Sequence, residues 1–124
     1  MSVLVDSDIL IEVSRERNHD ILLKWTELAE SGGAILCSPL SSAELWAGAL
    51  PREHEATTKL FSSLLCVPID YETGRQAGRY LRQYAKSHGV QIADALIAAA
   101  AVLNRAELWT RNRKHYPIKD LSFY

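Results

Sequence analysis

The sequence predicts an α/β fold of three layers, α/β/α, in which helices cover both faces of a mainly parallel sheet of four or five strands. Short apolar segments alternate along the chain with longer segments whose apolar residues recur at helical spacing, which is typical of parallel strands joined by helices. The chain has 124 residues, of which 48% are hydrophobic, and this is enough to form one core. We therefore expect residues 1–124 to form a single domain.

The apolar segments place four strands, at residues 3–5, 34–38, 66–69 and 107–110, and a candidate edge strand at 121–123. One helix is expected to begin near Ser7, and the others are expected at residues 19–31, 40–50, 51–65, 70–89 and 92–106. Proline marks the start of two of these helices, and Gly89 marks the end of the helix at 70–89. The boundaries therefore rest on residues that begin or end helices.

Charge and cysteine content restrict the possible functions. A formal net charge of -1 provides no general attraction for nucleic acid, so a polyanionic partner would be held by local basic patches. Cys37 and Cys66 lie far apart and form no C-x-x-C motif, which favours reduced thiols in the core. No secretion signal is visible, and the longest apolar run, at 95–103, is too short to span a bilayer. We expect a cytoplasmic protein.

Acidic residues follow the predicted strands, and in parallel sheets ligands bind at the carboxyl ends of the strands. Asp6 and Asp8 come directly after the first strand, where Asp6 is a candidate either for capping the next helix or for binding a ligand. Glu44 follows Ser41 by three residues, so a capping box explains it as well as a ligand site does. Considered singly, these acids do not predict a function.

Asp94 is harder to explain as a structural residue. It is the only charged residue between Gly89 and Arg105, in a helix expected to be buried nearly all round. An unpaired buried carboxylate is costly, so Asp94 requires a partner such as a cation. Together, Asp6, Glu44 and Asp94 predict a site for Mg²⁺, which prefers oxygen ligands. The four histidines include no i, i+4 pair, so a zinc site of that type is disfavoured.

Four segments in order, VLVDSDILIEV, SPLSSAELWAGA, IADALIAAAA and LWTRNRKHYP, resemble those of PIN-domain nucleases, and in particular VapC-type toxins of toxin–antitoxin pairs. The resemblance covers nearly the whole chain. It implies a PIN-like fold and an endoribonuclease dependent on Mg²⁺, or on Mn²⁺ in its place, that hydrolyses RNA with a metal-activated water. It also implies a homodimer that a small antitoxin protein neutralises.

The resemblance assigns roles to individual residues. Asp6, Glu44 and Asp94 match the acidic metal-binding triad of the family, and Thr110 and Asn112 match its polar segment beside the same pocket. The implied role of Asn112 is to orient a carboxylate by hydrogen bonding. Two positions depart from the family pattern. His115 stands where many relatives have an acid, and Asp8 stands where many have Asn, so either residue is a candidate to replace the fourth acid.

Two basic clusters are candidates for RNA binding. One is a stripe on the outer face of the helix at 70–89, formed by Arg75, Arg79, Arg82 and Lys86, for which an ordinary solvated face is the alternative. The other lies beside Asn112 and consists of Arg111, Arg113 and Lys114. Tyr116, which follows this second cluster, is a candidate for stacking on a base.

Two other functions remain open from the sequence. VLVDSD after a first strand also resembles the nucleophile motif of haloacid-dehalogenase-like phosphatases, although the paired acids and the later Lys of that class are missing. The absence of an acid at His115 permits a catalytically weak PIN-like module that binds RNA or a partner without cutting. Cleavage of RNA, and its loss on substituting Asp94, separates these possibilities.

Overall fold

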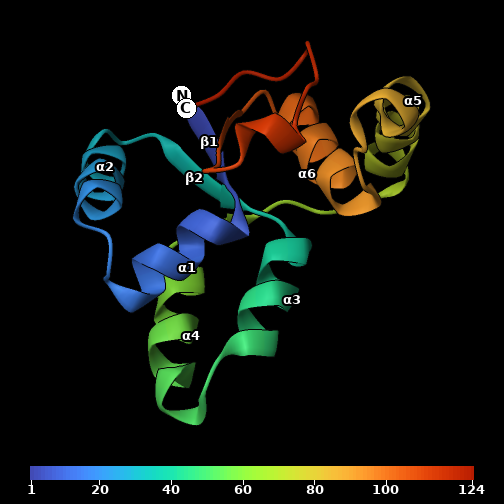
Figure 1. The fold of residues 1–124 in the computed structure, drawn as a ribbon. Helices are drawn as coiled ribbons and strands as arrows, with labels where there is room; N and C mark the ends of the chain where they lie inside the picture. Colours follow the sequence, from blue (N-terminus) through green and yellow to red (C-terminus); the bar gives the residue numbers. More distant parts are fainter.

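The computed structural model describes residues 1–124 and confirms the three-layer fold (Figure 1). The sheet consists of β1 (Ser2–Val5), β2 (Ala34–Cys37), β3 (Leu65–Cys66) and β4 (Glu107–Trp109), all parallel and in the order β3-β2-β1-β4. The six α-helices are α1 (Ser7–Arg15), α2 (His19–Glu30), α3 (Pro39–Gly48), α4 (His54–Ser62), α5 (Tyr71–His88) and α6 (Ile92–Leu103). Two short 3₁₀ helices are η1 (Pro51–Glu53) and η2 (Arg113–His115).

The central strand β1 supplies side chains to both helical layers. Leu4 lies opposite Leu36 in β2 and opposite Leu108 in β4, and these three leucines pack in one core with α5 and α6. Val3 and Val5 point the other way and pack with α1 and α2. Successive residues of a strand face opposite sides of the sheet. A strand that is apolar throughout therefore requires cover on both faces, as the sequence predicted.

Helix α6 is packed tightly against its neighbours, as expected. Its residues Ala98–Ala101 are all 0% exposed. Alanine side chains let α5 and α6 approach closely, and Figure 1 shows these two helices side by side on one face of the sheet. This packing fixes the position of Asp94 in the first turn of α6. None of the helices combines the length and the apolar character needed to cross a membrane.

The structure corrects the predicted elements between residues 51 and 69. The single helix expected at 51–65 is wrong, because η1 comes first and α4 begins only at His54. The Glu53 side chain accepts a hydrogen bond from the Leu50 amide at 2.9 Å, which closes η1 as a separate turn. The strand expected at 66–69 is only Leu65–Cys66, since Pro68 has no amide hydrogen to donate to the sheet.

Two smaller expectations also change. The edge strand expected at 121–123 is a single parallel bridge between Leu108 and Phe123, at the β4 edge of the sheet. Both cysteines are free thiols, as expected. Only Cys37 lies in the core, however, because Cys66 is exposed on the short strand β3.

Candidate active site

Four carboxylates from three helices and their caps line one cavity of about 220 Å³ at the carboxyl edge of the sheet. We call it the acidic cavity. Its lining residues are Asp6, Ser7, Asp8, Ile11, Glu44, Ala93, Asp94, Ile97, Asn112, His115 and Tyr116. The structure thus brings together the three acids predicted from the sequence and adds Asp8. No Lys or Arg belongs to the lining, and His115 is the only basic residue among the four carboxylates.

Asp6 both caps a helix and lines the acidic cavity. Its Oδ1 accepts a hydrogen bond from the Ser7 amide at 2.8 Å at the start of α1. Its Oδ2 accepts hydrogen bonds from the Thr110 hydroxyl at 3.0 Å and from the Tyr116 hydroxyl at 2.8 Å. Asp6 therefore caps α1 with one oxygen, while the other oxygen is held by residues that follow β4.

The base-stacking role predicted for Tyr116 is wrong. Tyr116 is 3% exposed, and its hydroxyl donates to Asp6. Burial raises the pKa of the Tyr116 phenol, and the negative charge of Asp6 raises it further, so the hydroxyl remains a donor at neutral pH. Sequence reasoning missed this role because residues 6 and 116 are brought together only by the fold.

The capping-box explanation of Glu44 is also wrong. Helix α3 begins at Pro39, and Ser38 is its N-cap, accepting a hydrogen bond from the Ser41 amide at 3.3 Å. Glu44 therefore lies beyond the first turn. Its Oε2 accepts a hydrogen bond from the Ser7 hydroxyl at 3.0 Å, which ties α3 to the start of α1 at the acidic cavity.

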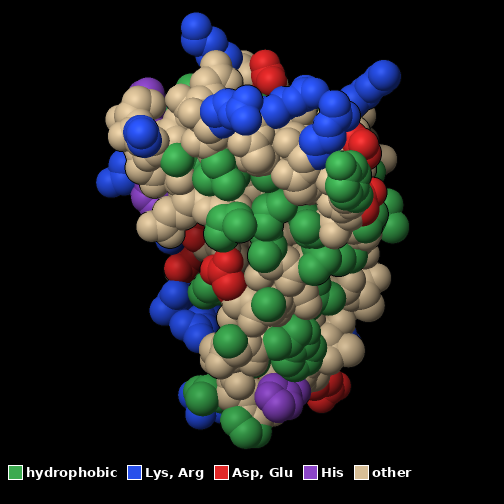
Figure 2. All heavy atoms as spheres, turned by 90° about the vertical axis from the view of Figure 1, so that its right-hand side faces the viewer, with side chains coloured by type: hydrophobic (Ala, Val, Ile, Leu, Met, Phe, Trp, Pro, Cys, Tyr) green, Lys and Arg blue, Asp and Glu red, His purple; other side chains and the backbone are tan.

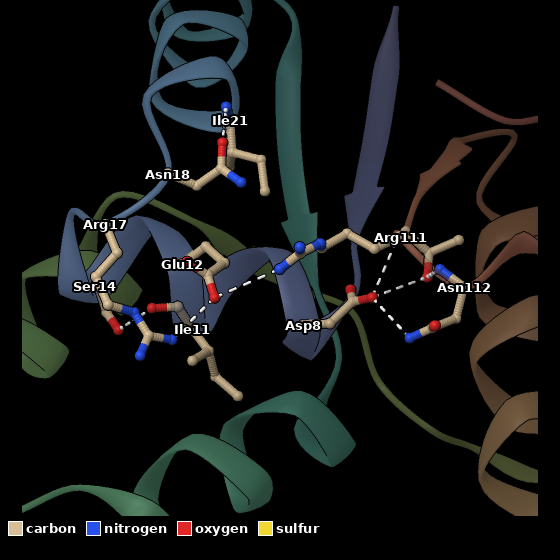
Figure 3. A network of polar contacts seen from close by, with 10 residues as sticks. Asp8, Ile11, Glu12, Ser14, Arg17, Asn18, Ile21, Arg111 and Asn112 are labelled. Atoms are coloured by element: carbon tan, nitrogen blue, oxygen red, sulfur yellow. Dashed lines mark hydrogen bonds and ion pairs between the residues drawn. The ribbon is translucent and has the colours of Figure 1, made fainter.

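Asp8 belongs to the same site, and Asn112 contacts it. Figure 3 shows Asp8 pointing toward the segment that follows β4, where its Oδ2 accepts hydrogen bonds from the Arg111 amide at 2.9 Å and from Asn112 Nδ2 at 3.1 Å. Its Oδ1 is buried and has no hydrogen-bond partner. Burial raises the pKa of Asp8, and the nearby charge of Asp6 adds to the effect. Asp8 thus supplies a free carboxylate oxygen in an acidic environment.

Asp94 is also in a place that disfavours its charge. Burial is the largest influence and raises the pKa of Asp94, and the charge of Asp6 acts in the same direction. The backbone of Gln91 and the imidazole of His115 lower the pKa in part. His115 lines the acidic cavity, so this candidate from the sequence is at the site.

The predicted basic stripe faces solvent, as expected, but it does not line the acidic cavity. Arg75, Arg79 and Arg82 surround a separate open cleft around Gly78 on α5. In Figure 2, Lys and Arg side chains gather along the upper edge of the molecule, where α5 lies. Hydrophobic side chains are spread over the middle of the same face.

The second basic cluster is divided by its contacts. The Arg111 guanidinium lies 3.4 Å from the carboxylate of Glu12, as Figure 3 shows. The Arg113 guanidinium donates to the Tyr124 carbonyl at 3.2 Å and lies over the ring of Phe123. Lys114 makes no ion pair. Of the three side chains, only Lys114 has neither an ion pair nor a contact with the C-terminal residues.

The acidic cavity suits a hard divalent cation by its chemistry. All four carboxylates offer oxygen, and Asp8 Oδ1 is a buried oxygen without a partner. No three His, Cys, Asp or Glu side chains are arranged to coordinate one ion directly. Mg²⁺ does not require such a shell, since it keeps several waters and usually binds one or two carboxylates. The residues present thus fit Mg²⁺ better than they fit zinc.

Comparison with known proteins decides the family. A family model described as the PIN domain matches residues 3–121. The chain belongs to the PIN domain family. This match selects the PIN resemblance over the phosphatase alternative drawn from the sequence.

Similar proteins agree with this assignment. This PIN domain is 33% identical over 117 residues to Ribonuclease VapC10 of Mycobacterium tuberculosis, covering 94% of this chain and 86% of that protein. It superposes with a TM-score of 0.84 on a chain of VapBC2 from Rickettsia felis bound to a promoter DNA fragment, at 21% identity, covering 100% of this chain and 98% of that one. A toxin–antitoxin complex from Klebsiella pneumoniae gives a TM-score of 0.70 at 22% identity, with 96% and 94% covered. Both solved structures therefore share the fold of this PIN domain.

Proposed function

We propose that this PIN domain is a metal-dependent endoribonuclease that hydrolyses phosphodiester bonds in RNA. The observation that carries the proposal is the acidic cavity, in which four carboxylates meet without a Lys or Arg. Such a cavity repels a phosphate unless a cation is present. The 33% identical protein named a ribonuclease supports RNA as the substrate.

Asp6, Glu44 and Asp94 would hold Mg²⁺ or Mn²⁺, and the free Oδ1 of Asp8 is a further oxygen at the same place. The bound ion supplies charge neutralisation at the phosphate and lowers the pKa of the attacking water. The protein's own contribution is positioning. Asn112 holds Asp8 through its amide, and the remaining lining residues limit the space at the site. Attack with departure of the 3′ oxygen leaves a 5′ phosphate on the product.

The hydroxyl donors around the site fix the carboxylates before any ligand binds. Thr110 and Tyr116 hold Asp6 Oδ2, and Ser7 holds Glu44. Their hydrogen bonds join α1, α3 and the segment after β4. Because supporting groups of this kind keep ligands aimed, we assign them a positioning role rather than direct contact with the substrate.

The test is to map new RNA 5′ ends after pulse expression of the wild type and of Asp94→Asn. New ends bearing 5′ phosphates are expected with the wild type and not with the variant. A matched control is Asp20→Asn, which changes an exposed acid in the first turn of α2 and should leave cleavage unchanged. Purified protein that binds RNA and never cuts it with Mg²⁺ or Mn²⁺ would contradict the proposal and support the binding-module alternative.

We also propose a small antitoxin partner and a homodimer. The fold shared with the Klebsiella pneumoniae toxin–antitoxin complex supports the first. Exposed Trp46, Tyr71 and Ile92 and the hydrophobic side chains on the face in Figure 2 support the second. Light scattering of the purified chain measures the homodimer, and co-purification with a small protein encoded beside its gene tests for the antitoxin. A monomeric mass would contradict the homodimer, and the absence of a co-purifying second chain would contradict the antitoxin partner.

A further inference from the structure

A second cavity adjoins the acidic cavity and includes Lys114, which the sequence marks only as one member of a basic cluster. It has a volume of about 180 Å³ and lies where the end of α5, the start of α6 and η2 meet. Its lining residues are His88, Gly89, Gln91, Asp94, Lys114 and His115. Asp94 and His115 line both cavities, so the two are neighbours across these side chains. We call it the Lys114 cavity.

The Lys114 cavity contains one lysine, two histidines and a single carboxylate, Asp94, whereas the acidic cavity contains four carboxylates and no Lys or Arg. Lys114 is exposed and unpaired, whereas Arg111 and Arg113 beside it in sequence are engaged with Glu12 and Tyr124. The three side chains therefore differ in availability, although the sequence presents them as one cluster.

His88 is held in a position that leaves one ring nitrogen free. Its Nδ1 lies 2.7 Å from the Ser87 hydroxyl, and its ring packs edge-on against Tyr84 at 5.8 Å between centroids. Its Nε2 has no protein partner and can donate to a ligand. Gly89 follows at the C-cap of α5 with φ +67°, a conformation that favours glycine, so the chain turns there toward α6.

An RNA strand cut in the acidic cavity needs such a neighbour. The scissile phosphate is flanked by further phosphates, and four carboxylates repel each of them. The RNA strand is therefore expected to extend from the acidic cavity along a surface that supplies positive charge or hydrogen-bond donors. On the side of α1, α3 and η1, a cavity shares Ile11 and Glu44 with the acidic cavity. Its two arginines, Arg15 and Arg52, face two carboxylates, Glu44 and Glu53, and Arg15 is paired with Glu53 at 3.5 Å. The Lys114 cavity has a single carboxylate, Asp94, beside Lys114 and two histidines. The arginines of α5 surround a cleft that shares no residue with either cavity.

We propose that the Lys114 cavity binds the RNA phosphate adjacent to the scissile one, with Lys114 as its cation and His88 and His115 as neighbouring donors. The proposal rests on the proposed ribonuclease function and names where the substrate lies beside that site. Lys114 acts by charge, as lysine commonly does toward phosphate.

The experiment measures RNA binding with Ca²⁺ in place of Mg²⁺, by fluorescence anisotropy of a short labelled single-stranded RNA at several KCl concentrations, and a gel of the same samples checks that the RNA stays intact. Lys114→Ala should weaken binding several-fold and reduce the slope of log affinity against log salt by about 0.7, the value for one phosphate contact on a single strand. His88→Ala together with Lys114→Ala should weaken it further. The matched control is Lys59→Ala, which removes an exposed lysine of α4 that lines none of the cavities.

Cleavage kinetics with Mg²⁺ provide the second readout. Lys114→Ala should raise KM and change kcat little, because the contact binds the strand and does not touch the reacting atoms. No RNA binding by the wild type, or equal affinity, salt slope and KM for wild type, Lys114→Ala and the double variant, would overturn the proposal. The proposal would also be overturned if Lys114→Ala weakened only the binding of the antitoxin and left RNA binding unchanged. Binding that depends on Lys114 without any cleavage would instead contradict the ribonuclease function and leave the phosphate site supported.

Discussion

Asp6 is held by donors from both ends of the chain. The Ser7 amide binds one of its oxygens, and the hydroxyls of Thr110 and Tyr116 bind the other. Hydrogen bonds to a charged group are stronger than neutral ones, and an underpaired buried carboxylate is unfavourable. The three donors therefore satisfy both oxygens of Asp6 and fix where the carboxylate lies.

Removal of one donor tests this description. Tyr116→Phe should lower the free energy of unfolding by about 1.5 to 3 kcal/mol, because it deletes a buried hydrogen bond to a carboxylate and keeps the ring. Urea unfolding in EDTA measures the change. Tyr71→Phe is the control, since Tyr71 is 82% exposed and should show no comparable loss. Equal midpoints for Tyr116→Phe and the wild type would contradict the prediction.

The sequence predicts the acids of the site better than the contacts that arrange them. Asp94 could be identified because a single charge in an apolar helix is visible in the sequence itself. Its recognition does not depend on knowing which residue contacts it. The contacts of Tyr116 with Asp6 and of Asp8 with Asn112 join residues more than 100 positions apart. No local pattern encodes such pairs, so only the fold reveals them.

Helix α5 illustrates how local signals define an element. Asp70 caps it, accepting hydrogen bonds from the Thr73 amide at 3.0 Å and from the Thr73 hydroxyl at 2.8 Å, and Gly89 ends it. Both ends therefore follow from nearby residues, and the predicted range 70–89 nearly equals the observed one. The strand predicted at 66–69 fails because it depends on pairing with β2, which Pro68 limits.

The cap of α5 also predicts a pH dependence. The hydrogen bonds from Thr73 lower the pKa of Asp70 in the folded protein, so its contribution to stability is present at neutral pH and is lost as the pH falls through that lowered pKa. Asp70→Ala should have a lower urea midpoint than the wild type at pH 7, and the difference should shrink in acid. Asp70→Asn keeps a capping oxygen and should lose less at neutral pH. If the difference in urea midpoint between Asp70→Ala and the wild type did not change with pH, the charge of Asp70 would be excluded as its cause.

At the scale of the whole molecule, the sheet assembles a charge that the chain alone does not balance. Asp6 and Asp8 lie at the start of α1, Glu44 lies in α3 and Asp94 lies in α6, and all four meet in the acidic cavity. Their mutual repulsion opposes folding, and a bound cation relieves it. The net charge of -1 conceals this local concentration.

Divalent metal should therefore stabilise the fold. Mg²⁺ or Mn²⁺ should raise the melting temperature relative to EDTA at the same ionic strength, by an amount that grows with metal concentration. Asp94→Asn should show a smaller rise, because it removes one of the four charges. Asp20→Asn, which changes an acid outside the cavity, should respond like the wild type. An unchanged melting curve of the wild type would argue against a metal site.

The pairing of β1 with β4, and of Asp6 with Thr110 and Tyr116, has a consequence for the synthesis of the protein. A ribosome synthesises residue 6 more than 100 residues before residues 110–116, so the growing chain carries its first acid long before the partners that position it. The acidic cavity can close only after residues 110–116 have left the ribosome. A chain whose translation stops before them therefore lacks the assembled site.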